Sequence, residues 1–123
     1  VSGGGHFGGG LFINALDMAR FGLLSLHKGK WNDKQLISEK WLDQSTTPTT
    51  ANTGYGFMNY FLNTDKKLLP SADEDVFVHI GNGTNMIYVD RKNQLVAVVR
   101  WIENASIDGF VSRMLQALPK NNK

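Results

Sequence analysis

Three short apolar segments separated by polar turns occupy the second half of the chain. They span 76–80, 86–89 and 95–101, and each is rich in β-branched or aromatic residues. The connections at 82–85 and 90–93 contain asparagine, glycine, aspartate and other turn-forming residues. Because parallel strands need long crossover connections, these short turns predict that the segments pair as an antiparallel meander.

An amphipathic helix is predicted directly after the meander. Ser106 is a suitable N-cap, and Pro119 ends the pattern. The apolar residues between them recur at helical spacing: Ile107, Phe110, Val111, Met114, Leu115 and Leu118. Such a stripe needs an apolar surface to cover, so we expect the helix to pack on one face of the meander.

Two further helices are predicted in the first half of the chain. Asn14 is a good N-cap for the first helix, and Gly29 can end it in the left-handed conformation. Ser38 is the expected cap of a second, shorter helix, with Trp41 and Leu42 as its buried contacts. The apolar face of the first helix is expected to comprise Leu16, Ala19, Leu23, Leu24 and Leu26.

Residues 55–62 alternate in a period of two and predict one further strand, covered at least partly on both faces. The chain has 123 residues, of which 41% are hydrophobic, and this suits one domain with a modest core. The predicted fold class is therefore α+β, with an antiparallel β-meander and flanking helices.

Composition excludes several function classes. The net charge of +2 comes from scattered residues and does not indicate a nucleic-acid surface. The absence of cysteine excludes disulfides, thiolate metal sites and a cysteine nucleophile. No apolar run approaches the roughly 20 residues that span a bilayer, so we expect no membrane contact from this chain. Because the sequence does not begin with methionine, we expect it to be cut from a longer protein.

Neither the glycine-rich start nor the histidines indicate a cofactor. Residues 3–10 hold six glycines but lack the preceding strand of a dinucleotide fingerprint and the Gly-Lys-Ser/Thr of a phosphate loop. His6, His27 and His79 have none of the short spacings of zinc motifs. We therefore expect no metal and no cofactor; His6 is interpreted as a loop residue and His27 as a helix C-terminal residue.

The sequence His-Ile-Gly-Asn-Gly at 79–83 is the candidate functional site. A histidine on a buried strand is usually a satisfied core residue, but Gly81 follows at the strand end, where a missing side chain admits a ligand or another backbone. Asn82 and Gly83 then offer backbone N–H groups. An ionisable ring beside such an edge is typical of a site for an anionic group or an acyl oxygen.

A series of short motifs resembles the C-terminal part of the serine β-lactamase and penicillin-binding-protein superfamily, on its class C β-lactamase, D-alanyl-D-alanine carboxypeptidase and esterase side. In order, the motifs are GGGLF at 8–12, DMARFG at 17–22, LIS at 36–38, WL at 41–42, YGF at 55–57 and HIG at 79–81. The last matches the family's third motif, in which histidine often replaces the lysine of K-T-G. Asn85 departs from the pattern, because many relatives carry glycine there.

The resemblance implies specific roles for the residues of this stretch. His79 would polarise the nucleophile region or hold an anionic part of the substrate, and Gly81 would admit the substrate to the strand edge. The backbone N–H of Asn82 would be one of two oxyanion-hole donors. Ile80 and Gly83 are the expected substrate-binding neighbours.

The family's S-x-x-K and Y-x-N motifs are absent from these 123 residues. The resemblance thus implies that residues 1–123 are the C-terminal portion of one β-lactamase-like domain, from which the N-terminal part with the nucleophile is missing. The whole protein would hydrolyse an amide or ester bond of a small-molecule or peptidoglycan-like substrate, in the periplasm or outside the cell, while this chain alone would be inactive. Histidine in place of lysine favours the lactamase, carboxypeptidase or esterase branch over a dedicated transpeptidase.

Two other interpretations remain open. One is a non-catalytic relative that uses the cleft for binding or sensing, and the other is a structural α+β domain outside this family. In the family, N-terminal strands complete the sheet, so we also expect this chain to have an unpaired edge along 95–101 and an uncovered sheet face. Such surfaces favour self-association or pairing with the missing segment.

Overall fold

The computed structural model describes residues 13–57 and 60–119. Its centre is a four-stranded antiparallel sheet in the order β3-β4-β5-β6. The strands are β3 (Phe61–Leu62), β4 (Phe77–Gly81), β5 (Asn85–Asp90) and β6 (Leu95–Val99). The α+β meander predicted from the short turns is therefore confirmed, with His79 opposite Ile87 and Gly81 opposite Asn85 in the register.

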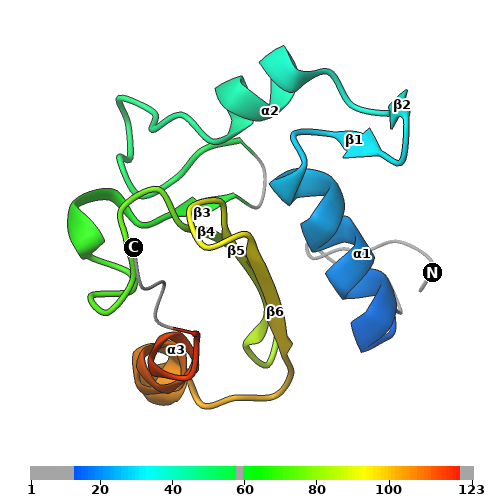
Figure 1. Cartoon of the computed structure of the whole chain (residues 1–123). Coiled ribbons are helices and arrows are strands. Elements are labelled where there is room, and N and C mark those ends of the chain that lie inside the picture. Colours follow the sequence, from blue (N-terminus) through cyan, green and yellow to red (C-terminus); the bar gives the residue numbers. More distant parts are fainter. Residues whose placement is uncertain (1–12, 58–59, 120–123) are drawn as a thin grey trace, which may run out of the picture.

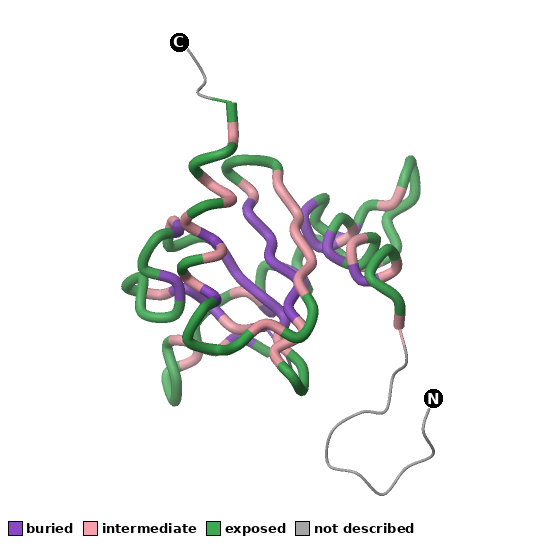
Figure 2. The backbone as a smooth tube through the Cα atoms, turned by 90° about the horizontal axis from the view of Figure 1, so that it is seen from below, coloured by how far each residue is buried: buried purple, intermediate pink, exposed green. Residues whose placement is uncertain are grey.

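Two helices cover opposite faces of this sheet (Figure 1). The helix α1 (Ala15–Leu26) contacts β5 and β6, and α3 (Ile107–Gln116) lies on the other side. Alternate strand residues therefore enter two separate cores: Val89 belongs to the α1 side and Tyr88 to the α3 side. Residues of β4 and β5 are buried on both faces, so the expectation of an uncovered face is wrong for these strands (Figure 2).

The first helix begins as predicted but buries a partly different set of residues. The side chain of Asn14 accepts a hydrogen bond from the Asp17 N–H at 2.9 Å, and Gly29 takes a φ of +81° just beyond the helix. The buried positions, however, are Met18, Gly22, Ser25 and Leu26. Leu16 is 70% exposed. The predicted apolar face is thus confirmed at Leu26 and wrong at Leu16 and Leu23, because small residues on α1 allow the helix to approach the sheet on a different face.

The final helix packs as its apolar spacing predicts. A short 3-10 helix (Asn104–Ser106) leads into α3, and Ser106 occupies the N-cap position without making a side-chain capping bond. Ile107 and Val111 are buried in the α3-side core. Residues of this stripe therefore cover the meander as expected.

A hairpin and a short helix follow α1. The hairpin consists of β1 (Lys30–Trp31) and β2 (Lys34–Gln35), and α2 spans Glu39–Ser45. Ser38 Oγ accepts a hydrogen bond from the Trp41 N–H at 3.2 Å, which confirms the predicted cap. Leu42 is buried, but Trp41 is 49% exposed, so its assignment as a buried contact is wrong.

The strand predicted at 55–62 is mostly wrong. The chain folds back on itself, so that Tyr55 forms an isolated bridge with Phe61 and the Gly56 N–H donates to the Tyr60 carbonyl at 2.9 Å. Only Phe61–Leu62 joins the sheet. Gly56 permits this turn, because a Cβ at that position would lie 1.9 Å from the Ser45 carbonyl oxygen.

The connection from β3 to β4 includes a short 3-10 helix (Thr64–Lys66) and is held from inside by Asn63. Its buried side chain donates to the carbonyls of Leu69 and Asp73, both at 3.0 Å, and accepts from the Leu69 N–H at 2.7 Å. These bonds satisfy a polar group that would otherwise be costly to bury. Of the described helices, none is long and apolar enough to cross a membrane.

Candidate functional site

The two sides of β4 differ along its length. On one side β5 pairs with β4 from Phe77 to Gly81, while on the other side β3 pairs only with Phe77 and Val78. Within residues 13–57 and 60–119, no strand pairs with Gly81 on the β3 side. Gly81 is exposed, and among the described residues the nearest atom that an added Cβ would meet is the Asn85 carbonyl oxygen, at 3.9 Å. The end of β4 thus has space for another chain or a ligand.

The turn that follows Gly81 is tightly organised. Gly83 and Thr84 both have positive φ values, of 72° and 52°. The Asn85 side chain donates to the Asn82 carbonyl at 2.6 Å, and its own oxygen accepts from Nε of Arg100 at 3.3 Å. Asn85, which departs from the pattern of the resemblance, closes the turn with its side chain.

The side chain of His79 lies in the core rather than at this exposed end. It is 4% exposed and points toward α1. Its ring lies 4.5 Å from that of Tyr60, 5.1 Å from that of Phe21 and 5.8 Å from that of Phe77, all in edge-on geometry. Burial raises the pKa of the Tyr60 hydroxyl above its usual range, so the neighbouring phenol is neutral.

The remaining predicted site residues separate by face. Ile80 packs against the α3-side core, so only its backbone belongs to the strand edge. Asn82 is exposed in the turn, and the Cα of Gly83 lies beneath the ring of Trp101. The structure therefore brings Gly81, Asn82 and Gly83 together at one turn. It places the His79 side chain away from this turn, in the core between the sheet and α1.

Two residues at this turn were missed from the sequence. Arg100 and Trp101 follow β6, and both contact the β4–β5 turn. The one sequence signal for a role was Trp101 itself, a tryptophan at the end of the strand predicted at 95–101. That strand was predicted to lie two strands away from the motif at 79–83. Only the meander places that strand end beside the turn.

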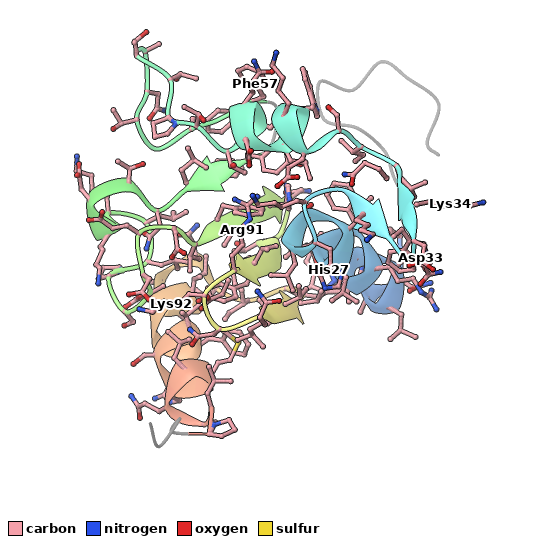
Figure 3. All side chains as sticks on the ribbon, turned by 45° about the horizontal axis from the view of Figure 1, so that its top comes forward. His27, Asp33, Lys34, Phe57, Arg91 and Lys92 are labelled. Carbon is pink, nitrogen blue, oxygen red and sulfur yellow. The ribbon has the colours of Figure 1, made fainter. Side chains whose placement is uncertain are left out.

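Other polar groups lie away from the turn. His27 lines a hollow of about 500 Å³ near the C-terminal end of α1, together with Lys30 and Trp31, and none of its lining residues belongs to the turn. Arg91 lies in the middle of the view in Figure 3, with its guanidinium 5.0 Å from the Phe77 ring centroid. The part of the chain that the structure describes has no cluster of three or more metal-ligating side chains. His6 and the glycine-rich stretch lie outside the described residues.

Comparisons with known proteins support the fold. No family model and no curated protein sequence matches the chain. Its structure is similar to that of a Bacillus anthracis protein provisionally named a 6-aminohexanoate-dimer hydrolase, with a TM-score of 0.57 and 19% sequence identity over 86% of this chain. The chain spans 30% of that protein's length. The chain thus has the α+β architecture of part of a β-lactamase-like fold.

Proposed function

We propose that this chain is the C-terminal part of a serine hydrolase that cleaves an amide or ester bond through an acyl-enzyme. The observation that carries the proposal is the open end of β4 at Gly81, followed directly by the Asn82 turn. A fold similar to part of a β-lactamase-like protein supports it. The substrate would be a β-lactam, a D-alanyl-D-alanine peptide or an ester.

The chemistry would divide between this chain and the segment that carries the nucleophile. There, a serine Oγ activated by a lysine would attack the substrate carbonyl carbon, and the leaving amine or alcohol would depart with a proton. Water would then hydrolyse the ester and restore the serine. The backbone N–H of Asn82 would stabilise the carbonyl oxygen as it becomes negative. Such a donor typically contributes about 2.7–4 kcal/mol to the transition state.

His79 would act on this site from beneath the strand. Its burial against Tyr60 and Phe21 supports a positioning role. In this role the ring holds the Gly81 end of β4 at a fixed distance from α1. Ile80 would contribute to substrate binding through its backbone and not its side chain. Gly83 would contribute only by shaping the backbone of the turn. We therefore assign direct contact with the substrate to Gly81 and Asn82.

The same burial supports a second candidate, a non-catalytic module that binds a ligand at the β4 edge. A histidine enclosed by three aromatic rings is also compatible with a purely structural role in the core. This candidate keeps the open strand end and its turn but needs no nucleophile. The two candidates differ in whether a covalent intermediate forms.

Intact-mass spectrometry after exposure to a fluorophosphonate or a penicillin separates these candidates. The samples are this chain and the longer protein that we propose contains it. We expect an adduct on the longer protein alone, mapped to a serine that precedes Val1. Absence of an adduct from both samples, with the longer protein folded by circular dichroism, would refute the hydrolase and favour the binding module.

We further propose that β6 is where this chain associates with another segment. It forms one edge of the four-stranded sheet, and all of its residues are only partly buried. An exposed edge presents unpaired backbone groups to any available strand. Sedimentation velocity across a concentration series should show self-association of the isolated chain. A single monomeric species at every concentration would contradict this.

A further inference from the structure

Trp101 is more exposed to solvent than is usual for a tryptophan. Its side chain is 70% exposed although indole is among the most favourable groups to bury. Its φ of +57° lies in the left-handed region, which bulky residues rarely occupy. Such a conformation persists only where the surrounding structure enforces it, and it recurs at functional sites.

The indole is held against the turn that follows the β4 edge. A Cβ added at Gly83 would lie 2.2 Å from Cζ3 and 2.3 Å from Cε3 of the ring, so only glycine allows this approach. The left-handed φ of 72° at Gly83 favours glycine as well. Part of the ring is therefore seated on backbone, while most of its surface faces outward.

A second contact ties the same strand end to the turn. Arg100 Nε donates to the Asn85 side chain, which in turn donates to the Asn82 carbonyl. Residues 100 and 101 thus contact the turn at both Asn85 and Gly83. The indole is consequently fixed relative to Asn82, the residue assigned to oxyanion stabilisation.

We propose that Trp101 is a specificity-determining residue whose indole stacks on a flat apolar group of the substrate. This inference rests on the proposed function, because it places the scissile carbonyl at the Gly81–Asn82 edge. The favoured substrates are then amides or esters that carry an aromatic or similarly flat apolar group on the side of the scissile bond that faces the Gly83 turn. Aromatic stacking of this kind adds to the free energy of area burial.

The test uses the indole N–H signals of this chain in a nitrogen-15 correlation spectrum. Phenylacetamide is the probe, and acetamide is the matched compound without the ring. Trp31 and Trp41 serve as internal controls, and Trp41 is a good one because it is 49% exposed. We expect phenylacetamide to shift the Trp101 signal saturably and acetamide to leave it in place, with little change at the controls.

Two variants sharpen the result. Gly83→Ala keeps the indole but displaces it from the turn, and Trp101→Leu removes the ring. We expect each to weaken phenylacetamide binding about two- to tenfold, as loss of one stacking contact implies. Trp41→Leu should bind as the unaltered chain does. If Gly83→Ala fails to fold, Trp101→Leu decides the question through the backbone amide signals of Gly81 and Asn82.

Three results would overturn the inference: equal shifts at all three indoles, no saturable shift at Trp101, or unchanged binding by Trp101→Leu. A Trp101 signal that moves with protein concentration instead of probe would assign the surface to contact between chains, and would also overturn it. Failure here is distinguishable from failure of the hydrolase proposal. A serine adduct on the longer protein without a Trp101 response refutes only the stacking role.

Discussion

The ring of Tyr60 meets the imidazole of His79 edge-on, with 4.5 Å between the ring centroids. Tyr60 directly precedes β3, and His79 lies in β4, so the contact joins neighbouring segments beneath α1. Phe21 of α1 also meets the imidazole edge-on, with 5.1 Å between the ring centroids. The motif histidine therefore forms part of the layer on which the open strand end rests.

Replacing His79 with phenylalanine separates its nitrogen chemistry from its packing. His79→Phe keeps an aromatic ring in the cluster, so we expect the free energy of unfolding to change by less than about 1.5 kcal/mol. His79→Ala leaves a cavity and should cost about 2–4 kcal/mol. In the longer protein we expect His79→Ala, which removes the ring that supports the Gly81 end of β4, to slow acylation by a fluorophosphonate, and His79→Phe, which keeps a ring there, to slow it less. Urea unfolding and adduct formation over time measure the two effects, and unchanged acylation would remove the functional role of the imidazole.

Gly81→Val tests access to the strand edge. Among the described residues, the nearest atom to a new Cβ is 3.9 Å away, so we expect the free energy of unfolding to change by less than about 1 kcal/mol. The added side chain would occupy the space proposed for substrate, and acylation of the longer protein should fall about tenfold or more. Urea unfolding and adduct formation again provide the measurements. Normal acylation in a folded Gly81→Val variant would show that substrate does not approach this edge.

Gly22→Ala tests the packing of α1 on the sheet. A Cβ at Gly22 would lie 2.6 Å from Cγ1 of Val96 and 2.8 Å from Cγ2 of Ile87. Alanine favours a helix over glycine by about 1 kcal/mol, but overpacking typically costs about 1–3 kcal/mol. We expect a net loss of stability in thermal and urea unfolding.

The double variant Gly22→Ala/Val96→Ala provides the control, because the second change makes room for the added methyl group. Its loss of stability should be smaller than the sum of the two single losses. Strict additivity, or a gain of stability from Gly22→Ala alone, would show that α1 does not approach β6 this closely.

Ionisation of the buried Tyr88 hydroxyl should make the free energy of unfolding decrease at high pH. Burial, together with the Asp90 carboxylate that accepts its hydroxyl hydrogen bond at 3.0 Å, raises the pKa of Tyr88 well above its ordinary value. The folded state thus holds this proton after the unfolded tyrosine ionises near pH 10. Above that pH, and up to the raised folded-state pKa, the unfolded state binds fewer protons. Stability should therefore decrease by up to about 1.4 kcal/mol per pH unit from this group.

Urea unfolding at a series of pH values from 8 to about 11 measures the effect. Tyr88→Phe removes the titrating hydroxyl, so its stability should decline less steeply above pH 10. Tyr60, whose pKa burial also raises, remains in both proteins and cancels in the comparison. Parallel curves for the two proteins would contradict the assignment to Tyr88.

Local patterns predicted the elements whose signals do not depend on distant contacts. The turn residues at 82–85 and 90–93 implied the meander, because short connections between strands permit only antiparallel neighbours. The spacing of Ile107 and Val111 implied a helix that covers it. The prediction of a strand at 55–62 was wrong because this segment depends on a distant contact. Gly56 fits against the Ser45 carbonyl, and the alternation of residues in the sequence gives no sign of that contact.

The sequence by itself determined that a glycine ends a strand after a histidine and that a tight turn follows. Those are short-range properties of backbone conformation and side-chain size. Only the tertiary structure decided that the imidazole is buried beneath α1 and that Trp101 lies on Gly83. The physical reason is that burial and ring contacts depend on which segments the sheet brings together, and the strand order places the end of β6 beside a turn far from it in sequence.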